Sequence, residues 1–462
     1  MKIYGRDKQI QIFQELLNNK KPAFMAIYGR RRIGKTYLVT EFFKEQKCNF
    51  FHLTGVKKAK SSIQLENFKY ALEATYKKSE AASFTNWNQA FVSLSKEIKK
   101  SKKKTVLFFD EVPWLTGGKS DFLLALDHFW NHYLSSDPNV ICIVCGSSAS
   151  WIIKKIIKGR YGFHHRLTHK IHLHPFDLYE TEGFLKLSGL DFGRQQIIEL
   201  YFAIGGVAKY LTLLKPNLSV VENIQEIIFS KEGLLYDEFE DLYSAIFNKH
   251  ENYVEIVKLL GQHHYGMTRD EIKKALGVSS GGSLTKWLED LETADFITAI
   301  SSYKKNRKEK IYLLTDEFSR FYLTWFAKGR RMPNEYWLQQ KRTAKYKTWA
   351  GLAFEVLCVK HIDIIKSKLG ITGIQTTESF YKNENCQIDL LIEREDRCIN
   401  ICEMKYSISL DLNEVKKELN FKKESFNKAT NNKKQLLATL ITNDDIKLTG
   451  QQREVIQKVV VI

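Results

Sequence analysis

Phosphate binding is the chemistry that the residues from Gly29 to Thr36 could perform. Their sequence, GRRRIGKT, has the spacing GxxxxGK[ST], and it stands between the apolar run Ala23 to Tyr28 and a helical apolar pattern. In such a loop the glycines let backbone N–H groups curl round phosphates, the lysine reaches the β and γ phosphates, and the hydroxyl ligates Mg²⁺. We therefore expect a strand, a loop and a helix that bind ATP. The expected contacts come from Gly29, Arg30, Arg31, Arg32, Ile33, Gly34, Lys35, Thr36 and Tyr37.

An acidic pair follows the next apolar run. Val106 to Phe109 have the pattern of a buried strand, and Asp110 and Glu111 come directly after it. A carboxylate at the tip of such a strand can hold the Mg²⁺ shell, a role that we assign to Asp110. Glu111 can then orient or activate the attacking water. The alternative is a purely structural acidic pair, which the phosphate-binding loop upstream makes less favoured.

Polar residues also follow the apolar run VICIVCG. Ser147 could sense the γ-phosphate through the attacking water, or it could belong to a polar turn. Arg160 and Arg166 are candidates for an arginine finger supplied to a neighbouring subunit, and we prefer Arg166 because it precedes the strand pattern KIHLHPF. The alternative for both is a surface arginine. His172 and His174 would share a strand face, but no acidic or cysteine partner has ligand spacing, so core or solvated histidines are favoured over a metal site.

A second set of charges lies near the C-terminus, in the strand pattern CINICEMK. Residues two apart share a face of a strand, so Glu403 and Lys405 would point the same way as Ile399 and Ile401. Burying such charges is costly unless they are paired or hold a metal. A structural salt bridge between Glu403 and Lys405 on an exposed edge is one solution.

A divalent metal site is the other solution. If the turn before this strand spans residues 395–397, Asp389 lies opposite Glu403, about 5 Å away, on a strand whose other face carries Ile388, Leu390 and Ile392. Two such carboxylates repel unless a cation lies between them, and Glu355, beside the apolar stripe of an earlier helix, adds a third. Hard oxygen ligands favour Mg²⁺ or Mn²⁺, which would activate a water and neutralise a scissile phosphate. Lys405 would position that water or help to deprotonate it.

The middle of the chain, residues 250–325, has a different pattern. MTRDEIKKALGV predicts a capped helix that starts after Thr268, and a turn and a second helix with an apolar stripe follow it. FITAISSYKKNRKEKIYLLT predicts two strands joined by a basic tip. This order resembles a winged helix, whose second helix and basic tip would contact DNA. The alternative is a winged helix that serves only as a spacer between domains.

Six segments in order, IYGRDKQI, GRRRIGKT, FFDEVPWL, CGSSASW, HHRLT and IGGVAKYL, resemble the prokaryotic AAA+-related ATPases called the archaeal ATPase family. That family is related to the STAND group and to origin-recognition ATPases, and the resemblance covers about residues 1–235. It implies a doubly wound parallel sheet with a helical lid, ATP hydrolysis, and the roles given above to the loop and the acidic pair. It also implies that Gly5 and Arg6 lie near the adenine and that Lys209 stands where related ATPases keep a lid arginine.

Residues 345–462 resemble the PD-(D/E)XK nuclease superfamily, which has the restriction-endonuclease-like fold. The resemblance rests on Glu355 in a helix, Asp389 in one strand, and Glu403 and Lys405 in the next, in that order. Ile388 stands before the aspartate, where the motif has proline. The resemblance implies metal-dependent hydrolysis of phosphodiester bonds.

Composition agrees with a folded protein that meets a polyanion. The 462 residues are too many for one ordinary core, and 71 Lys+Arg against 53 Asp+Glu give a net charge of +18. Seven cysteines are an odd number, and Cys142 and Cys145 lie within an apolar run, so we expect core thiols in a reducing compartment. The N-terminus lacks the apolar core of a signal peptide, and no apolar run is long enough to span a membrane, so we expect a cytoplasmic protein.

The elements that position these residues define the expected fold: an α/β chain with a P-loop NTPase sheet and helical lid, a winged-helix domain and a restriction-endonuclease-like α/β domain. The expected bounds are 1–180 for the ATPase core, 181–245 for the lid, 246–330 for the winged helix, 331–344 for a linker and 345–462 for the nuclease-like domain.

Two hypotheses of different class follow. The first is a Mg²⁺-dependent, DNA-directed ATPase fused to a nuclease and assembled by ATP into a homo-oligomer, with a role in defence or DNA processing. The second is a STAND-like switch that ATP drives to oligomerise, with a non-catalytic C-terminal domain that binds nucleic acid or a protein. A weaker third hypothesis is a winged-helix regulator of DNA whose occupancy the ATPase controls.

Overall fold

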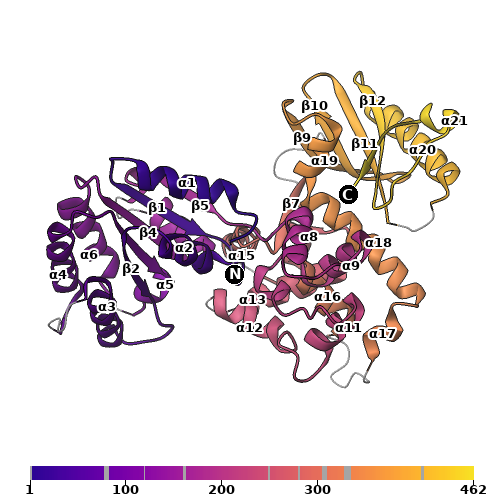
Figure 1. Ribbon diagram of the computed structural model, residues 1–462. Coiled ribbons are helices and arrows are strands. Elements are labelled where there is room, and N and C mark those ends of the chain that lie inside the picture. The colour runs from indigo at the N-terminus through magenta and orange to yellow at the C-terminus, as the bar shows by residue number, and fades with distance from the viewer. Residues whose placement is uncertain are drawn as a thin grey trace. The chain divides into compact units, whose positions relative to one another are not determined.

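Figure 1 shows the computed structural model of the chain, which describes residues 3–77, 83–118, 120–159, 163–247, 250–278, 281–303, 310–326, 335–406 and 410–462. The chain divides into two compact units. The first comprises Met1–Phe176 with Val207–Thr212, and the second comprises Asp177–Gly206 with Leu213–Ile462. Most of the segment expected to form a lid is therefore grouped with the second unit.

The first unit is built on a parallel sheet of five strands in the order β2-β3-β4-β1-β5. The strands are β1 Ala23–Tyr28, β2 Asn49–Thr54, β3 Thr105–Asp110, β4 Val140–Gly146 and β5 His169–His172. The expected α/β fold with a parallel sheet is thus confirmed. The central strands β1, β3 and β4 are buried along nearly their whole length, which explains their near-continuous apolar runs. The order places β4 between the strand that leads into the glycine loop and the strand that ends in the acidic pair.

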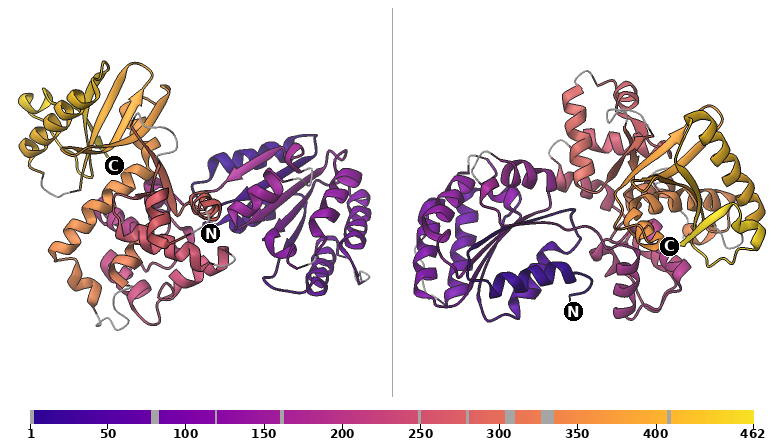
Figure 2. Two further views of the ribbon diagram at one scale, coloured as in Figure 1. Left: turned by 180° about the vertical axis from the view of Figure 1, so that it is seen from behind. Right: turned by 90° about the horizontal axis from the view of Figure 1, so that it is seen from above.

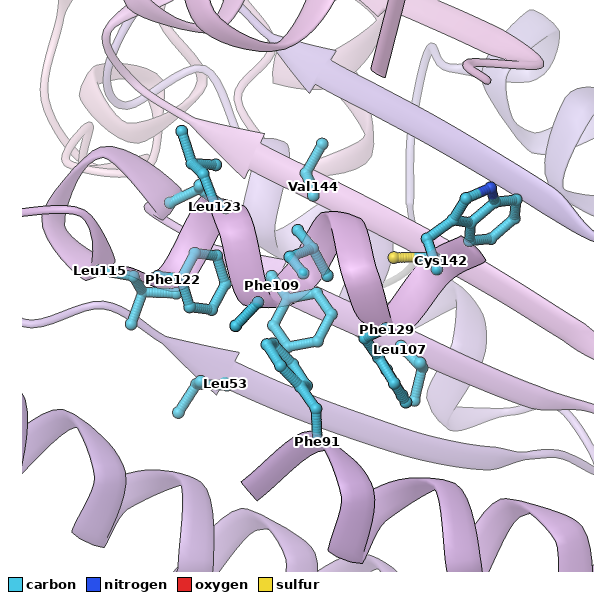
Figure 3. Close-up of a cluster of buried hydrophobic side chains, with 14 of the residues drawn as sticks. Leu53, Phe91, Leu107, Phe109, Leu115, Phe122, Leu123, Phe129, Cys142 and Val144 are labelled. Atoms are coloured by element: carbon cyan, nitrogen blue, oxygen red, sulfur yellow. The ribbon is translucent and has the colours of Figure 1, made fainter. Parts of the chain in front are cut away.

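Helices cover both faces of this sheet, as Figure 2 also shows. They are α1 Asp7–Asn18, α2 Lys35–Lys44, α3 Ser61–Tyr76, α4 Trp87–Lys100, α5 Val112–Leu115, α6 Phe122–Phe129, α7 Ala149–Ile152 and α10 Ala208–Leu211, with short helical turns at Trp130–Leu134, Ile153–Ile157 and Phe163–His165. α1 and α2 pack on one face of the sheet, and α3, α4 and α6 pack on the other. Figure 3 shows the core between the sheet and α3, α4 and α6, in which Phe91 of α4 lies among Leu107 and Phe109 of β3 and Phe122 and Phe129 of α6.

The second unit contains one mixed sheet of eight strands in the order β13-β12-β11-β10-β9-β7-β8-β6. The strands are β6 Met267–Thr268, β7 Ile297–Ser302, β8 Lys310–Leu314, β9 Thr376–Lys382, β10 Gln387–Arg394, β11 Cys398–Lys405, β12 Gln435–Thr442 and β13 Ile456–Val461. β7 pairs in parallel with β9 through Ser301 with Ser379 and Ser302 with Phe380. The hairpin of the middle segment and the strands of the C-terminal segment therefore share one sheet.

The second unit also contains many helices, some of which pack on this sheet and others on one another. They are α8 Leu178–Leu187, α9 Arg194–Ile204, α11 Val220–Ile224, α12 Glu238–Ile246, α13 Glu251–Gln262, α14 Arg269–Leu276, α15 Gly281–Thr293, α16 Glu317–Phe321, α17 Tyr336–Gln340, α18 Ala344–Lys360, α19 Ile362–Leu369, α20 Leu412–Thr430 and α21 Gly450–Arg453, with helical turns at Gln225–Phe229 and Tyr322–Phe326. α20 covers β10, β11 and β12 through Val415, Leu419 and Phe426. α18 packs against β11 and α9.

The middle segment forms the elements that its sequence predicts. α14 begins after Thr268, whose side chain accepts a hydrogen bond from the backbone N–H of Glu271, while the carboxylate of Glu271 accepts one from the N–H of Thr268. α15 follows, and then the antiparallel pair β7 and β8. The basic residues expected at the tip are Lys304, Lys305, Arg307, Lys308 and Lys310. The first four lie outside the described residues, and Lys310 begins β8. Residues 335–340, in the segment expected to be a linker, contain α17, whose Trp337 is buried.

One predicted strand face is wrong. Simple alternation places Ile388 with Leu390 and Ile392, but the pairing of β10 with β9 shifts register between Ile388 and Leu391. This β-bulge adds a residue to β10, so Ile388 joins the core cluster that contains Leu391 and faces α20. The turn after β10 is correct as predicted, because β10 ends at Arg394 and β11 begins at Cys398.

Two further expectations concern cysteines and membranes. Cys142 and Cys145 are buried in β4, in the clusters on opposite faces of the sheet, so the interpretation of this pair as core residues is confirmed. Within the ranges given above, no helix is long and apolar enough to cross a membrane.

Candidate functional site

The glycine loop connects β1 to α2, as the motif requires. The Lys35 ammonium donates hydrogen bonds to the carbonyl oxygens of Gly29 and Arg30, at 2.9 and 2.6 Å. Gly34 precedes α2 with φ +91°, a backbone conformation that favours glycine. Gly29 has φ +143°, and a Cβ there would lie 2.1 Å from the carbonyl oxygen of Leu173. The loop therefore requires both glycines, and its lysine is held at the N-terminus of α2.

The acidic pair meets this loop at the carboxyl edge of the sheet. The Thr36 hydroxyl donates a hydrogen bond of 2.6 Å to Oδ2 of Asp110, although the two residues are 74 positions apart. Asp110 is buried at the tip of β3. A hydroxyl and a carboxylate at this distance are the two protein ligands that Mg²⁺ needs beside a bound nucleotide, so the residues fit that ion.

Glu111 is turned away from the strand and toward β4. Its backbone has φ +47°, and its carboxylate accepts hydrogen bonds from Ser147, 3.1 Å from the backbone N–H and 2.9 Å from the hydroxyl. Burial raises the pKa of Glu111, while the Lys35 ammonium acts in the opposite direction. A glutamate with a raised pKa is better matched to accepting a proton from water. Ser147 thus fixes the orientation of the carboxylate expected to act on water.

The residues expected near the adenine are tied to the same loop. Arg6 donates a hydrogen bond of 3.0 Å to the carbonyl oxygen of His174, and its guanidinium lies 4.4 Å from the ring centre of Phe176. This segment adjoins the loop, because the N–H of Leu173 bonds the carbonyl oxygen of Tyr28, the last residue of β1. Gly5 has φ +61° and allows the chain to turn into α1.

Other expected contacts lie around the loop. Tyr37 is in the first turn of α2 and is exposed. Arg30 is fully buried, whereas Arg31 and Arg32 are half-buried. The N–H of Lys209 bonds the carbonyl oxygen of Arg32 at 3.1 Å, so α10 contacts the loop directly.

The predicted arginine finger has a partner within its own unit. Arg166 forms an ion pair with Asp127 of α6, and both side chains are half-buried. To serve a neighbouring subunit, Arg166 would have to leave this pair, and its role stays a prediction. Arg160 lies outside the described residues. His172 stacks on Tyr28 with ring centres 4.8 Å apart, as a packed side chain would.

The C-terminal carboxylates come from the elements that the sequence predicts. Glu355 lies in α18, Asp389 in β10 and Glu403 in β11. The pairing of β10 with β11 ends at Leu390 and Cys402, and Asp389 and Glu403 are the next residue of each strand beyond that pair. Gln387 donates a hydrogen bond of 2.7 Å to Oδ1 of Asp389 and fixes its orientation.

Glu403 belongs to a cluster of four charges. Its carboxylate lies 2.9 Å from the ammonium of Lys405 and 2.5 Å from that of Lys422 in α20. Glu418, one turn earlier in α20, lies 2.8 Å from Lys405 and 3.1 Å from Lys422. The salt bridge between Glu403 and Lys405 therefore exists, but not on an exposed edge: β11 lies inside the sheet and Glu403 is only 4% exposed. We refer to these four residues as the charge cluster.

Glu355 and Glu403 differ in the charges that surround their carboxylates. Burial raises the pKa of Glu355 to about 8, and the charges of Asp389 and Glu403 add to the effect. Burial lowers the pKa of Lys422, but the carboxylates of Glu403 and Glu418 together raise it more, and the net change is upward. Within the described residues, Glu355, Asp389 and Glu403 do not form a group whose ligand oxygens all lie within 4.8 Å of one another. The ammonium groups of Lys405 and Lys422 neutralise Glu403 here.

Residues beyond the predicted set also contribute. Lys422 and Glu418 are four positions apart on a helix, which is a signal that a search for paired charges would have found. Tyr265 gives no such signal: it stands between α13 and β6, far from the carboxylates in the sequence, yet it lines a cavity together with Glu355 and Asp389.

Comparison with known proteins agrees with the geometry of the first unit. Residues 3–214 match the model of a family described as "ATPase domain predominantly from Archaea". An uncharacterized protein of Methanocaldococcus jannaschii is 23% identical over 358 residues, which are 76% of this chain and 75% of that protein. The Walker-type ATPase of Pyrococcus abyssi matches 70% of this chain and 96% of its own, with a TM-score of 0.50 and 18% identity. The ORC2 protein of Aeropyrum pernix, solved as ADPNP–ADP complexes, matches 78% of this chain and 96% of its own, with a TM-score of 0.47 and 12% identity.

At 18% identity the likeness to the Pyrococcus abyssi ATPase shows the fold alone. The match over residues 3–214 spans the glycine loop, the acidic pair and the segment of Lys209. Residues 3–214 are therefore similar to the ATPase domains that this family model describes.

Proposed function

We propose that this chain is an ATP-hydrolysing machine that acts on DNA, in which the ATPase domain controls a metal-dependent nuclease formed by residues 345–462. One observation carries the nuclease part of the proposal. Asp389 and Glu403 are the residues next to Leu390 and Cys402, the last pair between β10 and β11, while Lys405 lies two residues beyond Glu403 and Glu355 is on a helix that packs against β11. Carboxylates of this kind suit Mg²⁺ or Mn²⁺.

ATP hydrolysis follows from the first unit. Lys35 would exchange its two loop carbonyls for the β and γ phosphates, because the P-loop lysine reaches these groups. Thr36 and Asp110 would hold Mg²⁺ between them. Glu111, oriented by Ser147, would accept a proton from the attacking water. A neighbouring subunit would supply Arg166 as the finger.

Phosphodiester hydrolysis would use the second unit. A metal bound by Asp389 and Glu403 would supply a low-pKa water and neutralise the scissile phosphate. Glu403 must then release one of its two ammonium partners, and Lys405, on the same strand, is placed to contact the scissile phosphate or the water. Gln387 would keep Asp389 oriented throughout.

Charge and architecture support DNA as the substrate. The chain carries a net charge of +18, which favours a polyanion. We assign residues 246–330 to a winged helix, and its hairpin shares a sheet with β9 of the proposed nuclease. DNA held by the hairpin would thereby be fixed relative to the carboxylates.

A pair of variants tests this function by separating its two activities. Lys35→Ala should abolish ATP hydrolysis and leave the second unit folded, whereas Asp389→Asn should abolish DNA cleavage in Mg²⁺ or Mn²⁺ and leave ATP hydrolysis intact. If purified wild-type protein with ATP and either metal never nicks DNA, the nuclease part fails. If both variants still hydrolyse ATP at the wild-type rate, the assignment of the loop fails.

The charge cluster favours one second candidate, a switch that ATP drives to oligomerise and whose C-terminal domain only binds a partner. Both oxygens of Glu403 have ammonium partners within the protein. For this candidate, Glu111→Gln should trap an oligomer in ATP, and Asp389→Asn should leave the biological function unchanged. Loss of that function in Asp389→Asn would exclude it.

A further inference from the structure

A cavity of about 330 Å³ lies within the second unit, beside the proposed nuclease site. Its walls come from both parts of the shared sheet: the turn between α13 and β6, the hairpin β7 and β8, helix α18, and strands β9 and β10. The cavity is at the low end of the roughly 300–1,000 Å³ typical of small-molecule sites. It has room for one ring system with its sugar, not for a paired double strand.

The walls of the cavity are acidic on one side and apolar on another. Glu355 and Asp389 form the acidic side, and under the proposed function Asp389 is one of the residues that hold the metal at the scissile phosphate. Val356, Phe380 and Met404 contribute an apolar side. An acidic metal-binding edge next to an apolar slot suits a ligand that is anionic at one end and flat and apolar at the other, which describes a nucleotide.

Tyr265 lines the cavity, and the residue is 54% exposed. The turn that carries it is rigid: the N–H of Gly266 bonds the carbonyl oxygen of His263 at 2.9 Å, and Gly266 has φ +76°. A Cβ on Gly266 would lie 2.7 Å from the carbonyl oxygen of Tyr312 in β8, so this turn is pressed against the hairpin. Burial and then the charge of Glu355 raise the pKa of Tyr265, which agrees with a ring close to the acidic side.

We propose that this cavity takes one unpaired nucleobase of the DNA strand that is cut, with the Tyr265 ring stacked against it. The proposal rests on the proposed nuclease function and deepens it by naming the substrate class: single strands, overhangs or frayed ends. A base within a duplex stays in its helical stack and does not enter such a pocket unless it is extruded. Stacking on an aromatic ring tolerates any base, so no sequence preference is expected.

Binding measured by fluorescence anisotropy tests the proposal on the full chain. The probe is one labelled DNA oligonucleotide, used as a single strand and as a blunt duplex, in Ca²⁺ and at one fixed salt concentration because such affinities depend on salt. Tyr265→Ala should weaken single-strand binding about fivefold or more, the loss expected for one base–aromatic stack, and should leave duplex binding unchanged. Tyr265→Phe should retain wild-type binding because it keeps the ring.

Phe421→Ala is the matched control. Phe421 is an aromatic side chain of the same unit with almost the same exposure, 53%, and it does not line the cavity. It should change neither affinity. The proposal is overturned if Tyr265→Ala leaves single-strand binding unchanged, or if it weakens single-strand and duplex binding equally.

Cleavage of the same probes in Mn²⁺ separates this proposal from the nuclease function. If wild-type protein cuts both forms equally fast and Tyr265→Ala changes neither rate, the nuclease stands and the base pocket fails. If wild-type protein cuts neither form but Tyr265→Ala still loses single-strand affinity selectively, the base pocket stands and the nuclease fails.

Discussion

Replacing Lys422 by methionine separates the two roles that Glu403 can have. In the structure Lys422 is a structural partner of Glu403, since the two are 2.5 Å apart and almost fully buried. Under the proposed function Lys422 is also a competitor, because a metal on Glu403 must displace an ammonium group. Lys422→Met should therefore destabilise the metal-free protein and strengthen its metal binding, two effects of opposite sign.

The size of the first effect follows from burial. Removing one partner of a buried ion pair costs about 3–5 kcal/mol. Because Lys405 remains 2.9 Å from Glu403, we expect the lower value, about 3 kcal/mol, for Lys422→Met. Lys428→Met, at an exposed position of the same helix, is the matched control and should change stability by less than about 0.5 kcal/mol.

The second effect follows from linkage. Mn²⁺ at about 100 times its Kd stabilises a folded site by about 2.7 kcal/mol, so a saturating concentration should restore most of what Lys422→Met loses. Wild-type protein should gain less at the same concentration, because its metal must first displace Lys422.

Amide hydrogen exchange followed by mass spectrometry is the appropriate assay, because it reads β11 and α20 separately from the ATPase domain. The reasoning is refuted if Lys422→Met exchanges no faster than Lys428→Met in these elements. The metal role is refuted if Mn²⁺ protects β11 equally in wild-type and Lys422→Met proteins, or if adding Asp389→Asn to Lys422→Met leaves the protection intact.

Three further predictions concern folding and the nucleotide loop. Burial lowers the pKa of His361 from 6.5 to about 4, so only the unfolded chain takes up that proton between these values. This group alone should lower the free energy of unfolding of the second unit by about 3 kcal/mol from pH 7 to 4, and the pH slope measured by hydrogen exchange should differ between wild-type protein and His361→Asn by that amount. An unchanged slope in the variant would contradict it. Gly29→Ala places a Cβ against the Leu173 carbonyl and should abolish ATP binding in a filter assay. Gly117→Ala is the control and should bind ATP normally, because its Cβ meets nothing closer than 3.6 Å. Equal ATP affinities of the two variants would show that the loop tolerates a side chain at position 29. Thr36→Val keeps the shape of the side chain but removes the hydroxyl, so the rate of ATP hydrolysis should fall at low Mg²⁺ and recover partly at high Mg²⁺. A loss of activity that does not depend on the Mg²⁺ concentration would argue against Thr36 as a Mg²⁺ ligand.

Local spacing was sufficient to predict the ATPase domain. A glycine loop between an apolar strand and a helix leaves few alternatives, because each residue type is needed at its position by backbone geometry or by phosphate chemistry. The positive φ values at Gly29 and Gly34 show that requirement directly. The hydrogen bond between Thr36 and Asp110 joins two motifs that the sequence could only pair by type.

The C-terminal site was predicted less completely because its remaining parts depend on long-range packing. The turn at 395–397 was correct, and so was the face of Glu403, but a β-bulge moved Ile388 to the other face. Bulges change strand geometry without a signature in simple alternation. The second ammonium partner of Glu403 comes from α20, and Tyr265 reaches the cavity only because the middle hairpin joins the C-terminal sheet. Strand pairing between distant segments cannot be read from either segment alone.

The rate at which the full chain cuts one labelled DNA strand in Mn²⁺, beside its Asp389→Asn variant, tests the central claim most directly. Asp389→Asn keeps the size of the side chain and removes one of the two carboxylates proposed to bind the metal, so the fold should be retained. Cleavage should fall by more than about 100-fold. Removing a residue that only supports a metal ligand already costs up to about 100-fold, so removing a ligand itself should cost more. Equal cleavage by both proteins would show that another site or a contaminant cuts the strand. Absence of cleavage by the wild-type chain would show that the carboxylates of β10 and β11 do not form a working nuclease.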